Sequence, residues 1–366
     1  MQVTMKRSYW LSLFMVVSIV SMAEASFDEP KLVPVASTES QKELIKEGVS
    51  LHEKGDYEGA IRKYEEVLAE NPANVGAMYE LSYTLEAKKD YQKSLETARK
   101  GAQYKSQLLD QFYLVIGNDL DDMGQRPQAI AAYREGLSIA PGNFLLHYNL
   151  ALAYDRERKW DEARRVLKTA VMLNPTHASS QLLLALEFSR SNFRIPSLLA
   201  AARFLVLEPN SSRSDEALNI LRQALKAGVS AGDQPGRINI TLDSSANKEE
   251  GDFGAAELVL SMSRAAGSVE RNRSKTEAEV QVDQWKVFLD VLTRTQAKGK
   301  HSQFVFNYYL PYFSELSKRR LVEPFVYYML QRTNVAGVAD WLSANRSQVD
   351  DFLAWSKQYS WPKKNP

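Results

Sequence analysis

The chain contains no cysteine among its 366 residues. That absence excludes disulfides, thiolate nucleophiles, cysteine-based metal sites and the acylated cysteine of a lipoprotein. Histidine is scarce as well: His52, His147, His177 and His301 are the four in the sequence, and no two form an H-x-x-x-H pair. We therefore expect no metal site.

Sequence motifs for cofactor binding are also missing. The chain has neither a G-x-x-x-x-G-K-[ST] phosphate loop nor a G-x-G-x-x-G dinucleotide fingerprint. One G-x-S-x-G occurs at Gly228, Ser230 and Gly232, but it follows a predicted helix, whereas a nucleophile elbow joins a strand to a helix. The match is best interpreted as chance, so we expect no catalytic residue and no cofactor.

The charges nearly balance, with 46 Lys and Arg against 45 Asp and Glu, which gives a formal net charge of +1. Nucleic acid as a partner would demand a basic surface, and this balance argues against it. The hydrophobic share of 44% is ordinary for a globular protein. The length exceeds what one hydrophobic core normally serves, so two folded parts are expected.

The N-terminus is typical of an export signal. Lys6 and Arg7 precede the apolar run Tyr9–Met22, and small residues flank a cleavage position before Ser26. The run of about 14 residues is short for a membrane-spanning helix, which needs about 20. We predict that residues 1–25 are a cleaved signal peptide, with an uncleaved membrane anchor as the alternative.

This prediction places the protein outside the cytoplasm, as a periplasmic or secreted protein of a bacterial envelope. Contact with the membrane is expected only if the N-terminal segment stays uncleaved. Removing Lys6, Arg7 and Glu24 with the signal changes the formal charge from +1 to zero.

A regular repeat dominates the sequence that follows. Similar residue types recur in register in five consecutive segments, which are 41–74, 75–108, 110–143, 144–177 and 178–211. The period of about 34 residues is the signature of a solenoid, in which each unit buries its apolar face against its neighbours. Leu109 is the single extra residue between the second and third segments.

Small residues occupy two fixed positions of each unit. The eighth position holds Gly48, Ser82, Gly117, Ala151 and Ala185, and the twentieth holds Ala60, Ser94, Ala129, Ala163 and Ser197. Two antiparallel helices approach closely only where neither side chain is bulky. Proline follows the second half of four units, at Pro72, Pro141, Pro175 and Pro209. Proline there ends a helix, so each unit is predicted to be a helix pair.

The pattern resembles the tetratricopeptide repeat, a helix–turn–helix unit of about 34 residues. The segments Gly55–Pro72, Gly124–Pro141 and Lys159–Pro175 carry the resemblance. It departs from the family pattern at Glu47, Ala98, Ser106 and Ala201. The resemblance implies an all-α fold: a right-handed superhelical solenoid of about five helix pairs that binds proteins and is not an enzyme.

The segments flanking the array have different patterns. Residues 26–40 form a leader, and residues 212–228 are predicted to be a capping helix that starts after Ser214 and ends at Gly228. Residues 229–251 are a polar linker. Within it Ile238, Ile240 and Leu242 alternate with polar residues, which predicts one short strand.

Residues 252–361 are helical by period and rich in aromatic residues. The predicted helices are Phe253–Ala266, Lys275–Ala297, Phe304–Ser317, Val322–Arg332, Val335–Ala344 and Gln348–Tyr359. Pro311 is expected to kink or divide the third of them. No motif assigns an activity to this C-terminal helical region.

The resemblance also implies a binding surface. In the tetratricopeptide family the first helix of each unit lines a concave groove, mainly through its second, fifth, ninth, twelfth and thirteenth positions. Carried across by position, the predicted groove residues are Tyr79, Tyr83, Asn118, Tyr148, Leu152, Asp155, Leu182 and Leu186. Fifth positions hold Ile45, Tyr79 and Leu114 where a cation would help, so we do not expect a carboxylate clamp.

An apolar stripe on a solvent face indicates a contact. Two covers stay open: an external peptide or helix, or the C-terminal region folding back. The first function hypothesis is a scaffold that binds a protein or peptide in the groove. The second is an enzyme or ligand-binding activity in the C-terminal region, with the repeats positioning it. The sequence leaves the oligomeric state open.

Overall fold

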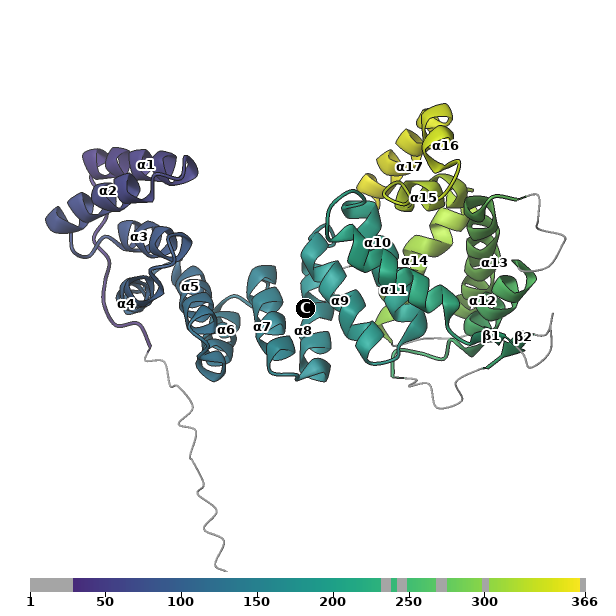
Figure 1. Ribbon diagram of the computed structural model, residues 1–366. Helices are drawn as coiled ribbons and strands as arrows, with labels where there is room; N and C mark the ends of the chain where they lie inside the picture. The colour runs from purple at the N-terminus through teal and green to yellow at the C-terminus, as the bar shows by residue number, and fades with distance from the viewer. Residues whose placement is uncertain (1–28, 232–237, 242–248, 268–274, 298–302, 363–366) are drawn as a thin grey trace, which may run out of the picture.

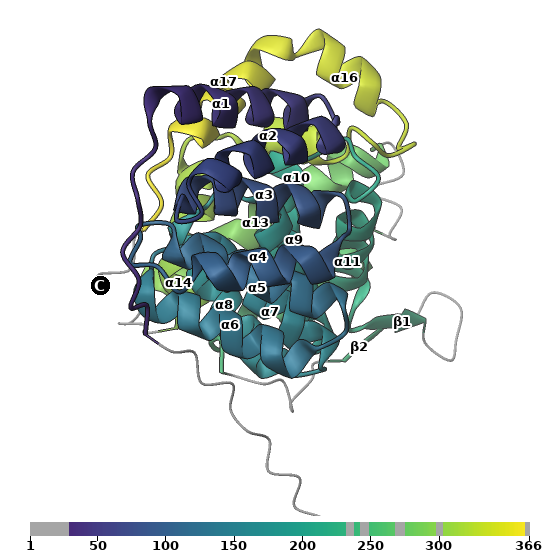
Figure 2. The same cartoon turned by 90° about the vertical axis from the view of Figure 1, so that its left-hand side faces the viewer.

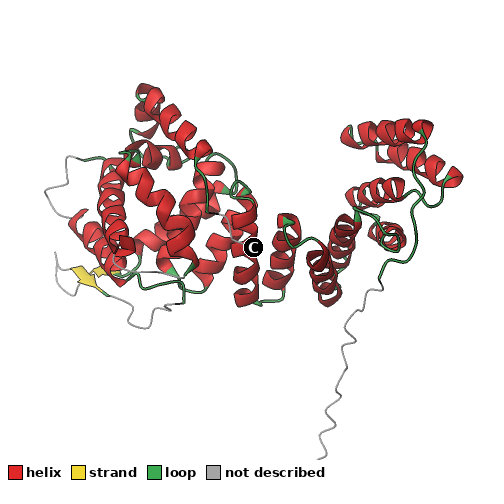
Figure 3. Cartoon of the chain, turned by 180° about the vertical axis from the view of Figure 1, so that it is seen from behind, coloured by secondary structure: helices red, strands yellow, loops and turns green. Residues whose placement is uncertain are grey.

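The computed structural model describes residues 29–231, 238–241, 249–267, 275–297 and 303–362 (Figure 1). The predicted signal peptide therefore lies outside the described residues. Within them the chain consists of helices joined by loops, together with one small hairpin and a single β-bridge between Leu32 and Tyr104 (Figure 3). None of the helices in these ranges is long and apolar enough to cross a membrane.

The structure confirms the predicted all-α solenoid. Five helix pairs follow one another: α1 (Glu39–Glu53) and α2 (Tyr57–Glu70), α3 (Val75–Ala87) and α4 (Tyr91–Gly101), α5 (Leu109–Asp122) and α6 (Arg126–Ile139), α7 (Phe144–Arg156) and α8 (Trp160–Leu173), α9 (Ala178–Arg190) and α10 (Arg194–Leu207). Each helix packs against the one before it and the one after it. Seen from the side of the first repeats, the array lies in front of the C-terminal helices (Figure 2).

Small residues allow the two helices of a pair to approach closely. A Cβ added at Gly48 would lie 2.5 Å from the ring of Tyr64, and one at Gly117 would lie 2.2 Å from the ring of Tyr133. Both distances are too short for two carbon atoms in contact. The glycine on the first helix and the tyrosine on the second are therefore complementary in size.

The turn inside each pair uses a left-handed residue. The fifteenth position has a positive φ in all five repeats: Gly55 (80°), Lys89 (67°), Gly124 (77°), Arg158 (57°) and Asn192 (58°). Glycine adopts this conformation without strain, whereas lysine and arginine do not. The turn geometry is therefore set by the repeat, even where the local residue disfavours it.

The leader ahead of the first repeat is ordered against the loops between repeats. The amide of Leu32 donates to the carbonyl of Gln103 at 3.0 Å, and the carbonyl of Leu32 accepts from Lys105 at 2.9 Å. Further along, the amide of Val35 donates to the carbonyl of Ala73 at 3.2 Å. These backbone hydrogen bonds bind the leader to the loops that follow α2 and α4.

The array ends in α11 (Ser214–Lys226), followed by a hairpin of β1 (Val229–Ala231) and β2 (Ile238–Ile240). Helix α11 packs against α9 and α10, as expected of a cap. Ser214 is the first helical residue and does not serve as the N-cap; its hydroxyl donates to the carbonyl of Glu208 at 2.8 Å. The expected strand is present, and its partner β1 pairs with it antiparallel. Leu242 lies outside the described residues.

Six helices form the described C-terminal region. They are α12 (Gly254–Gly267), α13 (Glu277–Ala297), α14 (Phe304–Lys318), α15 (Val322–Met329), α16 (Val338–Ala344) and α17 (Arg346–Gln358). Of the two effects expected of Pro311, division of the helix does not occur, because α14 runs without a break past that residue. Pro311 lies in the middle of α14, between the buried residues Leu310 and Tyr312, so packing on both sides holds the helix together.

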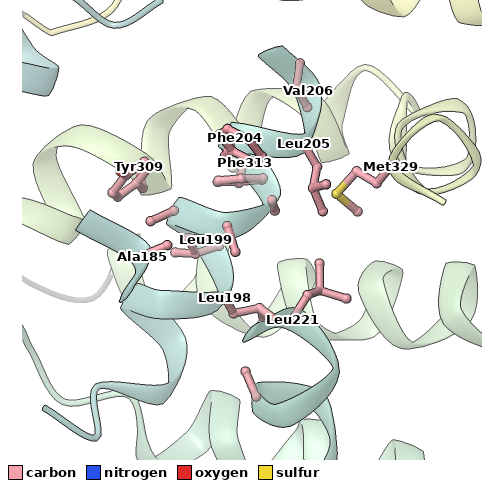
Figure 4. Close-up of a cluster of buried hydrophobic side chains, with 14 of the residues drawn as sticks. Ala185, Leu198, Leu199, Phe204, Leu205, Val206, Leu221, Tyr309, Phe313 and Met329 are labelled. Carbon is pink, nitrogen blue, oxygen red and sulfur yellow. The ribbon is translucent and has the colours of Figure 1, made fainter. Parts of the chain in front are cut away.

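Helix α10 lies at the centre of a core shared by the last repeat and the C-terminal region. Every residue from Ile195 to Val206 is buried, and α10 contacts α9, α11, α12, α14 and α15. Figure 4 shows Phe204 beside Phe313 and Leu205 beside Met329. The C-terminal region is therefore one packed body with the end of the array.

Polar contacts between the C-terminal region and the repeats fall on α8, α9 and α10. The hydroxyl of Tyr308 donates to the carbonyl of Val171 at 2.7 Å, and that of Tyr309 donates to Gln181 at 2.6 Å. These hydroxyls lie in a nearly dry interior, where each hydrogen bond fixes the position of its helix. The C-terminal region was one of the two covers considered for the groove. It packs mainly against α8 and α10, the second helices of the last two repeats.

Candidate functional site

The candidate site is the first-helix face, defined by the second, fifth, ninth, twelfth and thirteenth positions of each repeat, which lie on α1, α3, α5, α7 and α9. Its exposed apolar residues include Tyr83, with 45% of its surface accessible, and Leu145, with 38%. Of the other predicted groove residues, Tyr79, Tyr148 and Leu152 are half-buried. The face therefore retains apolar area in contact with solvent.

Four aromatic rings form a row across three consecutive repeats. The ring of His52 stacks on Tyr83 with centroids 5.1 Å apart, and Tyr83 stacks on Tyr79 at 6.2 Å. Tyr79 meets the edge of Phe112 at 5.9 Å. The Nδ1 atom of His52 lies 2.9 Å from the hydroxyl of Thr84. The row holds its rings in place, which lowers the entropy cost of binding.

The other half of the predicted surface is less uniform. The ring of Tyr148 packs edge-on against His177 at 4.9 Å, and Leu152 and Leu186 are half-buried beside the core. Leu182 is only 6% exposed and belongs to the core. Leu182 therefore offers little area to a partner, whereas Tyr148, Leu152 and Leu186 keep part of their surface accessible.

Asn118 is committed to contacts within the chain. Its Oδ1 atom accepts from the hydroxyl of Tyr133 at 2.9 Å and from Nδ2 of Asn149 at 2.7 Å, and its own Nδ2 donates to Glu86 at 3.0 Å. These bonds connect α3, α5, α6 and α7. Asn118 thus positions the repeats relative to one another.

Carboxylates at the twelfth position pair with arginines at the thirteenth position of the next repeat. Asp121 forms an ion pair with Arg156, and Asp155 forms one with Arg190. Arg190 also lies 2.7 Å from Glu187 of its own helix. The arginines of this face are therefore neutralised inside the array, and the pairs link successive repeats.

Three carboxyl groups near this face are buried or half-buried, and their removal from solvent raises their pKa values. Desolvation raises the pKa of Glu86 to about 7, against the opposing hydrogen bond from Asn118. The pKa of Asp119 rises to about 8, mainly through desolvation, with the nearby charges of Glu86 and Asp122 adding to it. The pKa of Glu187 is raised by burial and by its contact with Asp155. Burial thus favours the protonated form of each of these groups.

The described residues contain no group of three or more His, Asp or Glu side chains arranged to hold a metal ion. The histidines within them do not converge: His52 lies in the aromatic row, His147 is hydrogen-bonded to the carbonyl of Pro141, and His177 contacts Ser180. His301 lies outside the described residues. Of the G-x-S-x-G match, Ser230 lies on β1, and Gly232 also lies outside them.

Two family models match the sequence, both described as the tetratricopeptide repeat. One covers residues 45–106 and the other residues 122–186. Both fall on helix pairs of the array. The chain therefore contains tetratricopeptide repeats. No curated protein matches it.

Solved structures with partial similarity include other proteins of this kind. MamA from Desulfovibrio magneticus RS-1 is 19% identical, with a TM-score of 0.40 over 51% of this chain and 98% of that one. Pseudomonas aeruginosa PilF is 18% identical, with a TM-score of 0.43 over 51% and 89%. YrrB, described as a tetratricopeptide repeat protein with an unusual peptide-binding site, is 15% identical, with a TM-score of 0.40 over 48% and 90%. Likenesses this low say nothing about what this protein binds.

Two members of the aromatic row are absent from the predicted groove residues. His52 is at the twelfth position of the first repeat, and Phe112 is buried at the third position of its own. The register of the repeat places His52 on the face, so position alone could have found it. Phe112 joins the row through packing between repeats, for which the sequence carries no separate signal.

Proposed function

We propose that this tetratricopeptide repeat protein is a non-enzymatic scaffold that holds an apolar segment of a partner protein against the first-helix face. The observation that carries the proposal is the solvent-exposed ring of Tyr83 within a fixed aromatic row. Rigid aromatic side chains supply contact area at low entropy cost and are enriched among residues that dominate binding energy.

The charges of the face indicate what kind of segment it would accept. Arg156 and Arg190 are engaged by Asp121 and Asp155, and Asn118 is committed to its neighbours. Recognition would therefore rest on burial of apolar side chains rather than on ion pairs. Affinity that rests on apolar burial depends little on salt, because screening weakens only electrostatic attraction.

The test compares capture of proteins from a native envelope extract by three forms of the chain that starts at Ser26. These are the unaltered sequence, the double variant Tyr83→Ala with Tyr148→Ala, and the control variant Trp160→Ala. Trp160 is 42% exposed but lies on a second helix. We expect one protein to be recovered by the unaltered chain and the control and lost by the double variant.

Circular dichroism of each form provides the check on folding. The captured protein's apolar segment, made as a peptide, should then bind equally well at low and at high salt concentration. Equal capture by a well-folded double variant would contradict the assignment of this face.

We also propose that the protein is exported and acts in a bacterial envelope or outside the cell. The support is the N-terminal pattern of Lys6, Arg7 and the apolar run after them. The intact mass of the protein recovered from an exporting cell tests this. A mass that corresponds to a chain starting at Ser26 is expected, and a mass that still includes the segment ahead of Ser26 would favour the membrane anchor instead.

A further inference from the structure

A second candidate site lies away from the first-helix face, where the loops of the repeats meet the last described residues. It is a cavity of about 860 Å³, which falls within the size range of small-molecule sites. One wall comes from the end of α8 and the loops at Pro141 and Pro175, and the other comes from Ser356 to Trp361. Both walls belong to the described part of the chain.

Arg203 lines this cavity and is 2% exposed. Its Nη1 atom donates to the hydroxyl of Ser356 at 3.2 Å and its Nη2 atom to the carbonyl of Pro175 at 3.5 Å, while Nε donates to no group among the described residues. The guanidinium also lies 4.8 Å from the ring of Trp361. Within the described ranges it forms no salt bridge.

A second buried arginine in the same body shows the contrast. Arg164 is also 2% exposed, but it lies 3.6 Å from the carboxylate of Glu250, which is 1% exposed, and 3.2 Å from Glu249. The linker thus supplies carboxylates to one buried guanidinium and not to the other. Buried charges in proteins are normally paired, so Arg203 lacks an expected anion.

The lining of the cavity fits an anion with an apolar body. Lys357 adds a second cation, and none of the residues that line the cavity is a carboxylate. Apolar surface comes from Met172, Leu173 and Trp361, of which Leu173 is 42% exposed. A charged end could reach Arg203 while a hydrocarbon or aromatic body lies along these side chains.

We propose that this cavity binds a small carboxylic acid with an apolar body, such as a fatty or aromatic acid. The carboxylate pairs with Arg203, and Lys357 adds a charge at the rim. The site is separate from the first-helix face, so this proposal stands or falls independently of the scaffold function.

The experiment is isothermal titration calorimetry of the chain from Ser26, with dodecanoate below its micelle concentration as the probe. Dodecan-1-ol, which has the same chain and no charge, is the control ligand. We expect saturable binding of one dodecanoate per chain, and binding of the alcohol that is weaker by about tenfold or more, because a charge-assisted hydrogen bond is lost. Equal affinity for the two ligands, or no saturable binding of dodecanoate, would overturn the proposal.

Three variants identify the site. Lys357→Glu replaces an exposed residue and should weaken dodecanoate binding, whereas Lys54→Glu makes the same charge change at the end of α1 and should leave it unchanged. Arg203→Lys keeps the charge but removes the planar fork and should weaken binding further. Where Arg203→Lys fails to fold, Leu173→Asp tests the same cavity from an exposed position. Unchanged affinity in Lys357→Glu and in the folded cavity variant would refute the assignment.

Discussion

The first three repeats and the body that follows them are both helical, but they are held together differently. In the first part a second helix such as α6 packs against α5 and α7, its neighbours in sequence. In the second part α10 is contacted by α12, α14 and α15 as well as by its neighbours. One part is a linear stack with local contacts, and the other is a globular core built from distant segments.

The difference follows from what each second helix offers its surroundings. Helix α6 buries one face only. On its other side Ile139 is exposed and Glu135 is half-buried. Helix α10 is apolar almost all round, and a helix of that kind needs a cover on every side. The C-terminal region supplies the cover, so the solenoid ends in a core and not in an open repeat.

The largest expected effect is a break of that shared core. Phe204→Ala removes a fully buried ring between α10 and α14 and should lower the free energy of unfolding by about 3–5 kcal/mol. Urea unfolding followed by tryptophan fluorescence measures the loss, because Trp285 lies in the same core. The control is Leu173→Ala at an exposed position, which should cost far less.

Phe204→Ala also tests whether the last repeat and the C-terminal region are one cooperative body. If they are one body, the transition seen by fluorescence and the transition seen by the helical circular dichroism signal should shift together. A fluorescence transition left in place while the repeats lose stability would show that the C-terminal region folds by itself.

The next effect is a change in the stability of the stacked repeats with pH. The pKa of buried Asp119 is raised from 3.8 to about 8, so the folded state holds a proton that the unfolded state releases. Stability should therefore fall as the pH rises from about 4 to about 8. Asp119→Asn removes the part of this dependence that comes from Asp119 and should raise the free energy of unfolding at pH 8.5 by on the order of 2 kcal/mol.

Urea unfolding at pH 5, 7 and 8.5 checks the pH prediction, with Glu65→Gln, at an exposed position of α2, as the control that removes a carboxylate elsewhere in the repeats. The control should keep the pH dependence of the unaltered chain. An Asp119→Asn variant with an unchanged pH profile would assign the dependence to other groups.

The smallest effect concerns the turns. Lys89 has a φ of 67° at the position where two other repeats carry glycine, so Lys89→Gly should stabilise the chain by about 0.5–1 kcal/mol. Gly124→Ala at the equivalent turn, where φ is 77°, should destabilise it by about 1 kcal/mol. Thermal unfolding of both variants measures the pair, and a loss of stability in Lys89→Gly would mean that the lysine side chain stabilises its turn.

Features that arise within one repeat could be predicted from the sequence, whereas contacts between repeats could not. The helix pairs were predictable because Gly48 and Gly117 mark helix crossings and proline marks the helix ends, all within a single unit. The predicted groove residues remain a prediction about binding. Their intrachain contacts, such as Asn118 with Asn149, were not predictable, since they depend on how one repeat is rotated against the next.

By itself the sequence determined that this protein is a stack of helix pairs, because small and apolar residues recur at the same positions of every unit and pack in the same way. Only the tertiary structure decided that α10 is enclosed by the C-terminal region, that Asp155 pairs with Arg190, and that Arg203 is buried without a carboxylate among the described residues. Those outcomes join residues far apart in the chain or in successive repeats. Their pairing is set by the geometry of packing, which no local pattern records.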